Sequence, residues 1–84
     1  MIAKGSVLSI QQNDKTCLIR LRTVRGSIIK CFCNEKITER ILSQNPKYVR
    51  FVADEIKNGI LQVLFFDICK VEPKLQTTDG YEVL

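Results

Sequence analysis

The stretch that decides the fold is residues 16–24, which read TCLIRLRTV. Ile19 and Leu21 share one face of this stretch, whereas Arg20 and Arg22 share the other. A period of two with one apolar face is typical of a β-strand that is buried on one side. The stretch therefore predicts a strand with a basic outer face.

Similar segments lie on both sides of this strand. The other expected elements are strands at residues 2–11, 27–33, 48–56 and 60–71, and a helix at residues 35–43. The order strand, strand, strand, helix, strand, strand predicts a mostly β fold, a small five-stranded antiparallel barrel with one short helix. Barrels of this kind often bind single-stranded nucleic acid on a face of their strands.

Turn residues separate the expected strands. Residues 13–15 (Asn-Asp-Lys) form a polar tight turn, and Gly26 supplies a positive φ at the next turn. The Asn-Gly pair at residues 58–59 is the strongest signal, because it fits a primed hairpin turn. Gly5 inside the first strand indicates a bulge or bend, as a barrel needs where a strand curls.

The expected helix has a start and a stop signal. Asn34 can cap its N-terminus through the side-chain oxygen, and Pro46 disfavours helical geometry at the residue before it. Ile37, Ile41 and Leu42 lie on one side of the helix and are expected to close one end of the barrel. The alternative is a loop with one helical turn.

Residues 60–71 are apolar on both faces. Strict alternation gives one row of Ile60, Leu64, Phe66 and Ile68, and a second row of Leu61, Val63, Phe65 and Cys69. The C-terminal tail, the helix or another chain must cover the second row. We therefore expect a protein partner, or self-association into a homo-oligomer, through Leu61, Val63 and Phe65.

A chain of 84 residues makes a single domain with one small core. Residues 1–72 are assigned to the barrel, and residues 73–84 to an extended or disordered C-terminal tail. The hydrophobic content of 45% is that of an ordinary globular chain. The expected core comprises Ile19, Leu21, Val49, Phe51, Leu64 and Phe66.

The formal net charge of +4 permits contact with phosphates, although many proteins of other functions carry as much. No basic segment followed by an apolar one opens the sequence, so no leader is expected. The longest apolar run, residues 63–66, is far too short to cross a membrane. We expect a cytoplasmic protein without membrane association.

Four cysteines, Cys17, Cys31, Cys33 and Cys69, invite a zinc interpretation. Structural zinc sites use paired C-x₂₋₄-C knuckles on turns, whereas the close pair here is C-x-C within an expected strand. Thiols also stay reduced in the cytoplasm. We expect buried, reduced thiols with no metal and no cofactor, and a zinc-dependent module remains the alternative.

Catalytic motifs are missing from the sequence. It contains no histidine, no glycine-rich phosphate loop and no nucleophile elbow. Asp54, Glu55 and Asp67 are dispersed acids that fit solvated positions. The chain is therefore not expected to be an enzyme.

The candidate site is the outer face of the second, third and fourth strands. Along each of these strands, outward basic and aromatic residues alternate with inward core residues. It comprises Arg20, Arg22, Lys30, Phe32, Tyr48 and Arg50, and Arg25 extends it from the turn after the second strand. Cations neutralise phosphates while aromatic rings stack on bases, which suits single strands. Two alternatives stay open: the charges are only a solvated face, or Phe32 is core with Cys31 and Cys33 turned outward.

The chain resembles the oligonucleotide/oligosaccharide-binding (OB) fold, and its segment from residue 27 onward looks like the second half of single-stranded DNA-binding proteins. The resemblance covers residues 4–72 and follows SIIKCFCN at 27–34, a short helix, YVRFVADEI at 48–56, Asn-Gly and the last strand. It implies an OB-like barrel. The connecting loops are short here, which implies weak nucleic-acid binding or another use of the barrel.

Two functions follow as expectations. The first is a non-enzymatic binding module for single-stranded DNA or RNA, held on the basic face. The second is a protein-interaction module, an adaptor, inhibitor or subunit that docks through residues 60–71 and the C-terminal tail.

Overall fold

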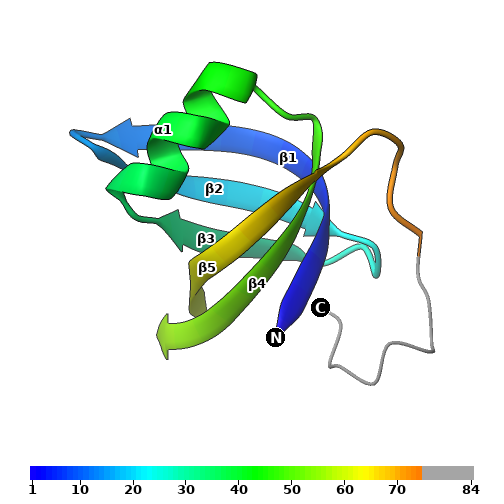
Figure 1. Cartoon of the computed structure of the whole chain (residues 1–84). Helices are drawn as coiled ribbons and strands as arrows, with labels where there is room; N and C mark the ends of the chain where they lie inside the picture. Colours follow the sequence, from blue (N-terminus) through cyan, green and yellow to red (C-terminus); the bar gives the residue numbers. More distant parts are fainter. Residues whose placement is uncertain (75–84) are drawn as a thin grey trace.

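The computed structural model describes residues 1–74 and confirms the expected order of elements (Figure 1). They are β1 (Ile2–Asn13), β2 (Thr16–Thr23), β3 (Ile28–Cys33), α1 (Glu35–Gln44), β4 (Tyr48–Lys57) and β5 (Ile60–Cys69). Most of the tail expected at residues 73–84 lies outside the described residues. The chain is a small, mostly β structure with a helix between the third and fourth strands.

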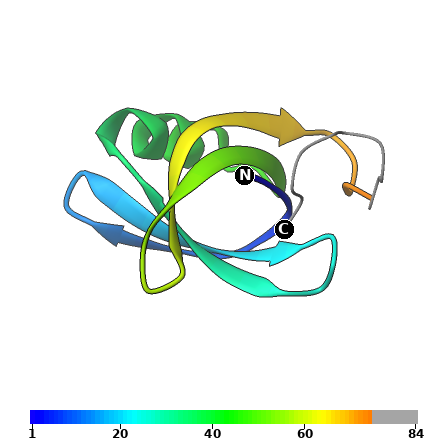
Figure 2. The same cartoon turned by 90° about the horizontal axis from the view of Figure 1, so that it is seen from below.

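The strands close into a barrel in the order β1-β2-β3-β5-β4, and Figure 2 shows them encircling a common interior. Four of the seams are antiparallel, but β3 and β5 pair in parallel through residues 30–32 and 60–62. The expectation of a purely antiparallel barrel is therefore wrong in this detail. An odd number of strands cannot alternate in direction around a closed ring, so one seam must be parallel.

Strand β1 belongs to two seams, which overlap at Gly5 and Ser6. Gly5 pairs with Thr23 of β2 and with Val49 of β4. A Cβ atom at this position would overlap the backbone carbonyl oxygen of Arg22, so only glycine allows β1 to lie this close to β2. The bulge itself lies further along, where Val7 and Ser9 are paired and Leu8 between them is not.

The turns and the helix cap follow the local sequence. Asn58 and Gly59 both have positive φ, 55° and 76°, as a primed hairpin turn requires. The Asn34 side chain accepts a hydrogen bond of 3.0 Å from the Ile37 backbone N–H. Asn45 ends the helix in the left-handed region with φ 47°, and its N–H donates to the Ile41 carbonyl.

Helix α1 lies over one end of the barrel (Figure 1) and buries Ile37 and Ile41 as expected. Leu42 does not join them, because its side chain is 41% exposed. Thr38 takes the third buried position, and its hydroxyl lies 3.1 Å from the Cys33 carbonyl oxygen and 3.3 Å from the Cys17 sulfur. The buried side of α1 therefore contains Thr38 in the place where Leu42 was predicted.

Five of the six expected core residues are buried: Ile19, Leu21, Val49, Phe51 and Phe66. The rings of Phe51 and Phe66 meet edge to face at a centroid distance of 6.4 Å. Arg40 of α1 covers the Phe66 ring at 4.7 Å. The interior of the barrel is thus filled by side chains from all five strands, Ala3 of β1 and Cys31 and Cys33 of β3 included, and is closed at the helix end.

The expected rows on β5 are wrong because the strand contains a bulge. Val52 pairs with Phe65 and the next residue, Ala53, pairs with Val63, so Leu64 has no partner across the seam. One extra residue shifts the alternation of side chains. As a result, Val63 and its neighbour Leu61 face the core, while Leu64 and Phe65 are exposed.

Two further bulges, one on β1 and one on β4, also contain one residue without a partner across the seam. Leu8 is the extra residue between Val7 and Ser9 on β1, and Ile56 is the extra residue before Lys57 on β4. All three extra residues, Leu8, Ile56 and Leu64, are large, apolar and at least 41% exposed. Bulges of this kind increase the local bend and twist of a strand, which a closed barrel of few strands needs.

Candidate nucleic-acid interface

The regular parts of β1, β2 and β3 place two rows of side chains on one outer face. By register, Ser9, Arg20 and Lys30 form one row across the three strands. Gln11, Leu18 and Phe32 form the next row, two residues further along each strand. We call these six residues the β1–β2–β3 face.

The inward neighbours fix the orientation of this face. Cys31 and Cys33 are fully buried, so Phe32 between them points outward and is only half-buried. Ile19 and Leu21 are likewise fully buried, which directs Arg20 to the outside. The alternative in which Phe32 is core and the two cysteines face outward is therefore wrong.

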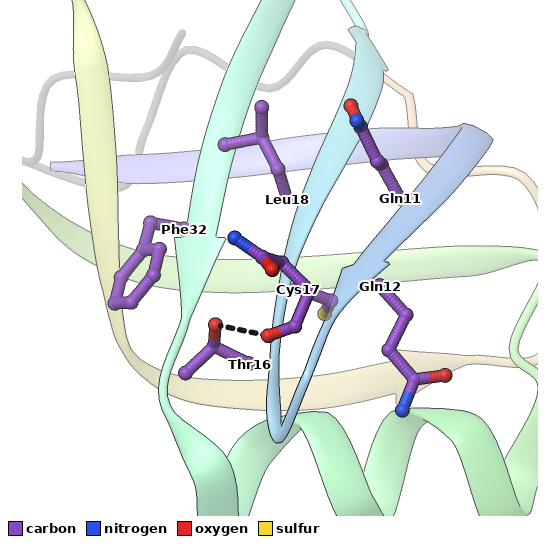
Figure 3. Close-up of a pocket in the computed structure, with 7 residues that line it drawn as sticks. Gln11, Gln12, Thr16, Cys17, Leu18 and Phe32 are labelled. Carbon is purple, nitrogen blue, oxygen red and sulfur yellow. Dashed lines mark hydrogen bonds between the residues drawn. The ribbon is translucent and has the colours of Figure 1, made fainter.

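Two adjoining hollows lie along the face. One of about 460 Å³ is lined by Gln11, Gln12, Asn13, Thr16, Cys17, Leu18 and Phe32 (Figure 3). The other, about 380 Å³, is lined by Ser9, Gln11, Leu18, Arg20 and Lys30. Gln11 and Leu18 border both, so the hollows form one groove with a neutral part and a cationic part.

The cationic part brings two like charges together. Arg20 and Lys30 are direct partners across β2 and β3, and both are exposed. Within residues 1–74 neither of them forms an ion pair. Like charges directly opposite on neighbouring strands destabilise a sheet, and a bound anion relieves that repulsion. The pair is thus suited to hold a phosphate.

The remaining early cations lie further along the same strands. Arg22 is exposed and pairs with Ile28 of β3 and with Ser6 of β1. Arg25 is exposed in the turn that joins β2 to β3. Both are therefore continuous with the β1–β2–β3 face at the end opposite to Phe32.

Tyr48 and Arg50 lie at the edge of this group, on the far side of β1. They pair with Ser6 and Lys4 of β1, and Ser6 also pairs with Arg22, so Tyr48 stands in the same row as Arg22 with β1 between them. Arg50 Nη1 also lies 3.3 Å from Asp67 Oδ2, which neutralises much of its charge. Lys47 covers the Tyr48 ring at 5.4 Å. The candidate face is narrower than the sequence alternation indicates.

The residues expected as a partner interface are split by the β5 bulge. Leu61 and Val63 are 3% and 0% exposed and belong to the core, so they offer no surface to a partner. Phe65 is 71% exposed, as expected. Leu64, which was expected in the core, lies beside it at 41% exposure.

The cysteines behave as core residues. Cys17, Cys31 and Cys33 are buried, and Cys69 is half-buried. Burial raises the pKa of the Cys31 thiol to about 12, and burial together with the nearby Cys17 thiol raises that of Cys33 further. Such thiols stay protonated, which disfavours both metal binding and nucleophilic chemistry. In the described part of the chain, no cluster of acidic, cysteine or histidine side chains is arranged to hold a metal.

Leu18 and Gln11 are site residues that the sequence reasoning missed. The alternation of β2 already turns Leu18 outward with Arg20, so its position on the face could have been found. Gln11 reaches the groove because β1 is long, running to Asn13, and pairs with Leu18 beyond the Leu8 bulge. No local signal in the sequence indicates that pairing.

The fold and this face define a small closed β-barrel with a partly basic, partly neutral groove on three strands. Comparison of the chain with protein-family models gave no match. Comparison with curated protein sequences gave no significant match either. Among the described residues, no helix has the length and apolar character needed to cross a membrane.

Proposed function

We propose that this chain is a non-enzymatic binding module that holds single-stranded nucleic acid on the β1–β2–β3 face of an OB-type barrel. The observation that carries the proposal is the exposed Arg20–Lys30 pair, two cations held face to face one row from the outward Phe32 ring. Phosphates bind the cations, and an unpaired base stacks on the ring. The function needs no cofactor.

A single strand suits this groove better than a duplex. Bases in a duplex are stacked on each other and hide their faces, whereas a single strand can place a base on an aromatic side chain. The turns that flank the barrel are short, with two residues between β1 and β2 and two between β4 and β5. They add little contact area, so we expect weak binding of a few nucleotides.

The salt dependence of oligonucleotide binding tests this function. If about three phosphates are neutralised, log affinity falls against log salt with a slope of about −2. The Arg20→Ala/Lys30→Ala variant should reduce the magnitude of the slope by about 1.4, because it removes two phosphate contacts. Fluorescence anisotropy with labelled single strands at several salt concentrations measures both slopes.

Two control variants separate charge from stacking. Arg50→Ala removes a cation that lies on β4 and is paired with Asp67, so the slope should stay that of the parent. Phe32→Ala should weaken binding by about 1–3 kcal/mol without changing the slope, because stacking releases no counterions. A folded Arg20→Ala/Lys30→Ala variant that binds as the parent does would show that the face is only a solvated surface.

A second candidate function is self-association through β5, favoured by the exposed Phe65 and Leu64 side chains. Large apolar side chains side by side on a surface are typical of a protein contact. Sedimentation velocity over a range of concentrations tests it: the parent should dimerise, and Phe65→Ser should stay monomeric. A parent that remains monomeric at high concentration contradicts this candidate.

We also propose a cytoplasmic location. The support is that all four cysteines are free thiols and that Cys17, Cys31 and Cys33 are buried, a state that reducing compartments maintain.

A further inference from the structure

The groove has two chemically different parts, and the neutral part is not explained by phosphate binding. No charged side chain lines the hollow around Phe32. Its lining is rich in amide and hydroxyl groups, from Gln11, Gln12, Asn13 and Thr16 (Figure 3). Amide side chains carry a donor and an acceptor side by side, which is the pattern on the edge of a nucleobase.

Two of these polar groups are already engaged with the β1–β2 turn. Gln12 Nε2 donates to the Asp14 carbonyl oxygen at 3.0 Å, and Thr16 Oγ1 donates to the Asn13 carbonyl oxygen at 3.0 Å. These bonds hold the wall of the hollow in place. The Gln11 amide, by contrast, makes no hydrogen bond to any residue that the structure describes. It is therefore available to a ligand, and it is the amide of the hollow that lies in the same row across the strands as Phe32.

The spacing of the two parts matches one nucleotide. Gln11, Leu18 and Phe32 form one row across the strands, and Arg20 and Lys30 stand in the row two residues away. Two residues along a strand span about 7 Å, comparable to the separation of a base from its own phosphate. A base in the neutral hollow thus leaves its phosphate at the cationic one.

We propose that the neutral hollow is a nucleobase subsite that prefers adenine, with the base stacked on Phe32 and its edge read by the Gln11 amide. The same nucleotide places its phosphate between Arg20 and Lys30. Adenine is the base whose N6 donor and N7 acceptor best match a glutamine amide. This inference rests on the proposed single-strand binding and adds the base that the groove selects.

Homopolymer oligonucleotides test the preference. The parent should bind oligo(dA) about fivefold or more tightly than oligo(dT) of equal length. Gln11→Ala should lower the affinity for oligo(dA) until the two affinities agree within about twofold, and the salt slope should not change because the amide is neutral. Anisotropy titrations at one low salt concentration measure the ratio, and circular dichroism checks that the variant is folded.

Gln62→Ala is the matched control. Gln62 pairs with Phe32 from the other side, on β5, and carries the same amide, but it does not line the hollow. Its removal should leave the preference for oligo(dA) unchanged. If Gln62→Ala abolishes the preference as Gln11→Ala does, the amide effect comes from disturbing Phe32 and the subsite is wrong.

A second measurement uses single nucleotides. Adenosine 5′-monophosphate should shift the backbone amide resonances of Gln11, Leu18 and Phe32, whereas ribose 5-phosphate should shift those around Arg20 and Lys30 alone. Equal binding of oligo(dA) and oligo(dT) with a normal salt slope would overturn the adenine subsite and leave the proposed function standing. Absence of any single-strand binding at low salt would overturn the proposed function, and the subsite with it.

Discussion

Phe51 is the largest side chain in the centre of the barrel. It is 0% exposed and meets Phe66 edge to face, with α1 covering that ring through Arg40. Phe51→Ala should lower the free energy of unfolding by about 3–5 kcal/mol, from lost burial and the cavity left behind. Chemical denaturation measures the change. A loss below about 1 kcal/mol would contradict the position of Phe51 in the core.

The Cys31 thiol makes stability depend on pH in the alkaline range. Its pKa is raised from 9.0 to about 12 by burial. Between these values the unfolded chain has lost the proton that the folded chain keeps, so rising pH favours unfolding. The contribution of the Cys31 thiol to the free energy of unfolding falls by up to about 1.4 kcal/mol between pH 8 and pH 10.

The Cys31→Ala variant isolates the effect of this thiol from every other pH-dependent contribution to stability. The difference in unfolding free energy between the parent and Cys31→Ala should become smaller by up to about 1.4 kcal/mol from pH 8 to pH 10. Cys69→Ala is the comparison, because Cys69 is only half-buried. A difference that stays constant over this pH range would show that the buried thiol does not resist ionisation.

At the scale of the element, the β5 bulge is the feature that can be tested by neighbouring substitutions. Val63 is fully buried and Leu64 is 41% exposed, although the two are adjacent in the sequence. Val63→Ser should cost about 2 kcal/mol or more, since it replaces two buried methyl groups with one buried hydroxyl. Leu64→Ser should stay within about 1 kcal/mol. The reverse order of costs, in denaturant unfolding, would place the bulge elsewhere.

Local sequence signals determine the ends of α1, whereas its buried side is seen only in the folded structure. The Asn34 cap and the stop before Pro46 lie in the sequence and fix where α1 begins and ends. The side of α1 that faces the barrel includes Thr38, whose hydroxyl donates to the Cys33 carbonyl oxygen and contacts the Cys17 sulfur. A buried threonine with a satisfied hydroxyl can therefore replace the leucine that periodicity favours.

At the scale of the molecule, barrel closure joins residues that are far apart in the chain. Ile2 pairs with Val52, and Lys30 pairs in parallel with Ile60. Closing such long loops before the contacts form is entropically costly, so folding is expected in milliseconds to seconds. Stopped-flow refolding measures the rate. Folding within microseconds would show that local contacts, not the two seams, limit the reaction.

The candidate face also depends on the whole molecule. Arg20, Lys30 and Phe32 could be grouped from the sequence because β2 and β3 pair without a bulge, so their alternation holds throughout. Arg50 could not be separated from them, since its alternation on β4 is equally regular. Only the order of strands around the barrel shows that β1 stands between β4 and β2.

The sequence by itself determined the order of elements, the turns, the helix cap and the inward faces of β2 and β3. These features depend on residues near each other in the chain, through backbone preference and side-chain period. Tertiary structure decided the parallel seam between β3 and β5 and the bulges at Leu8, Ile56 and Leu64. The reason is that closing five strands into a ring imposes direction and curvature on every strand. The alternation of side chains within a single strand indicates neither the direction of its neighbours nor the curvature that closure requires.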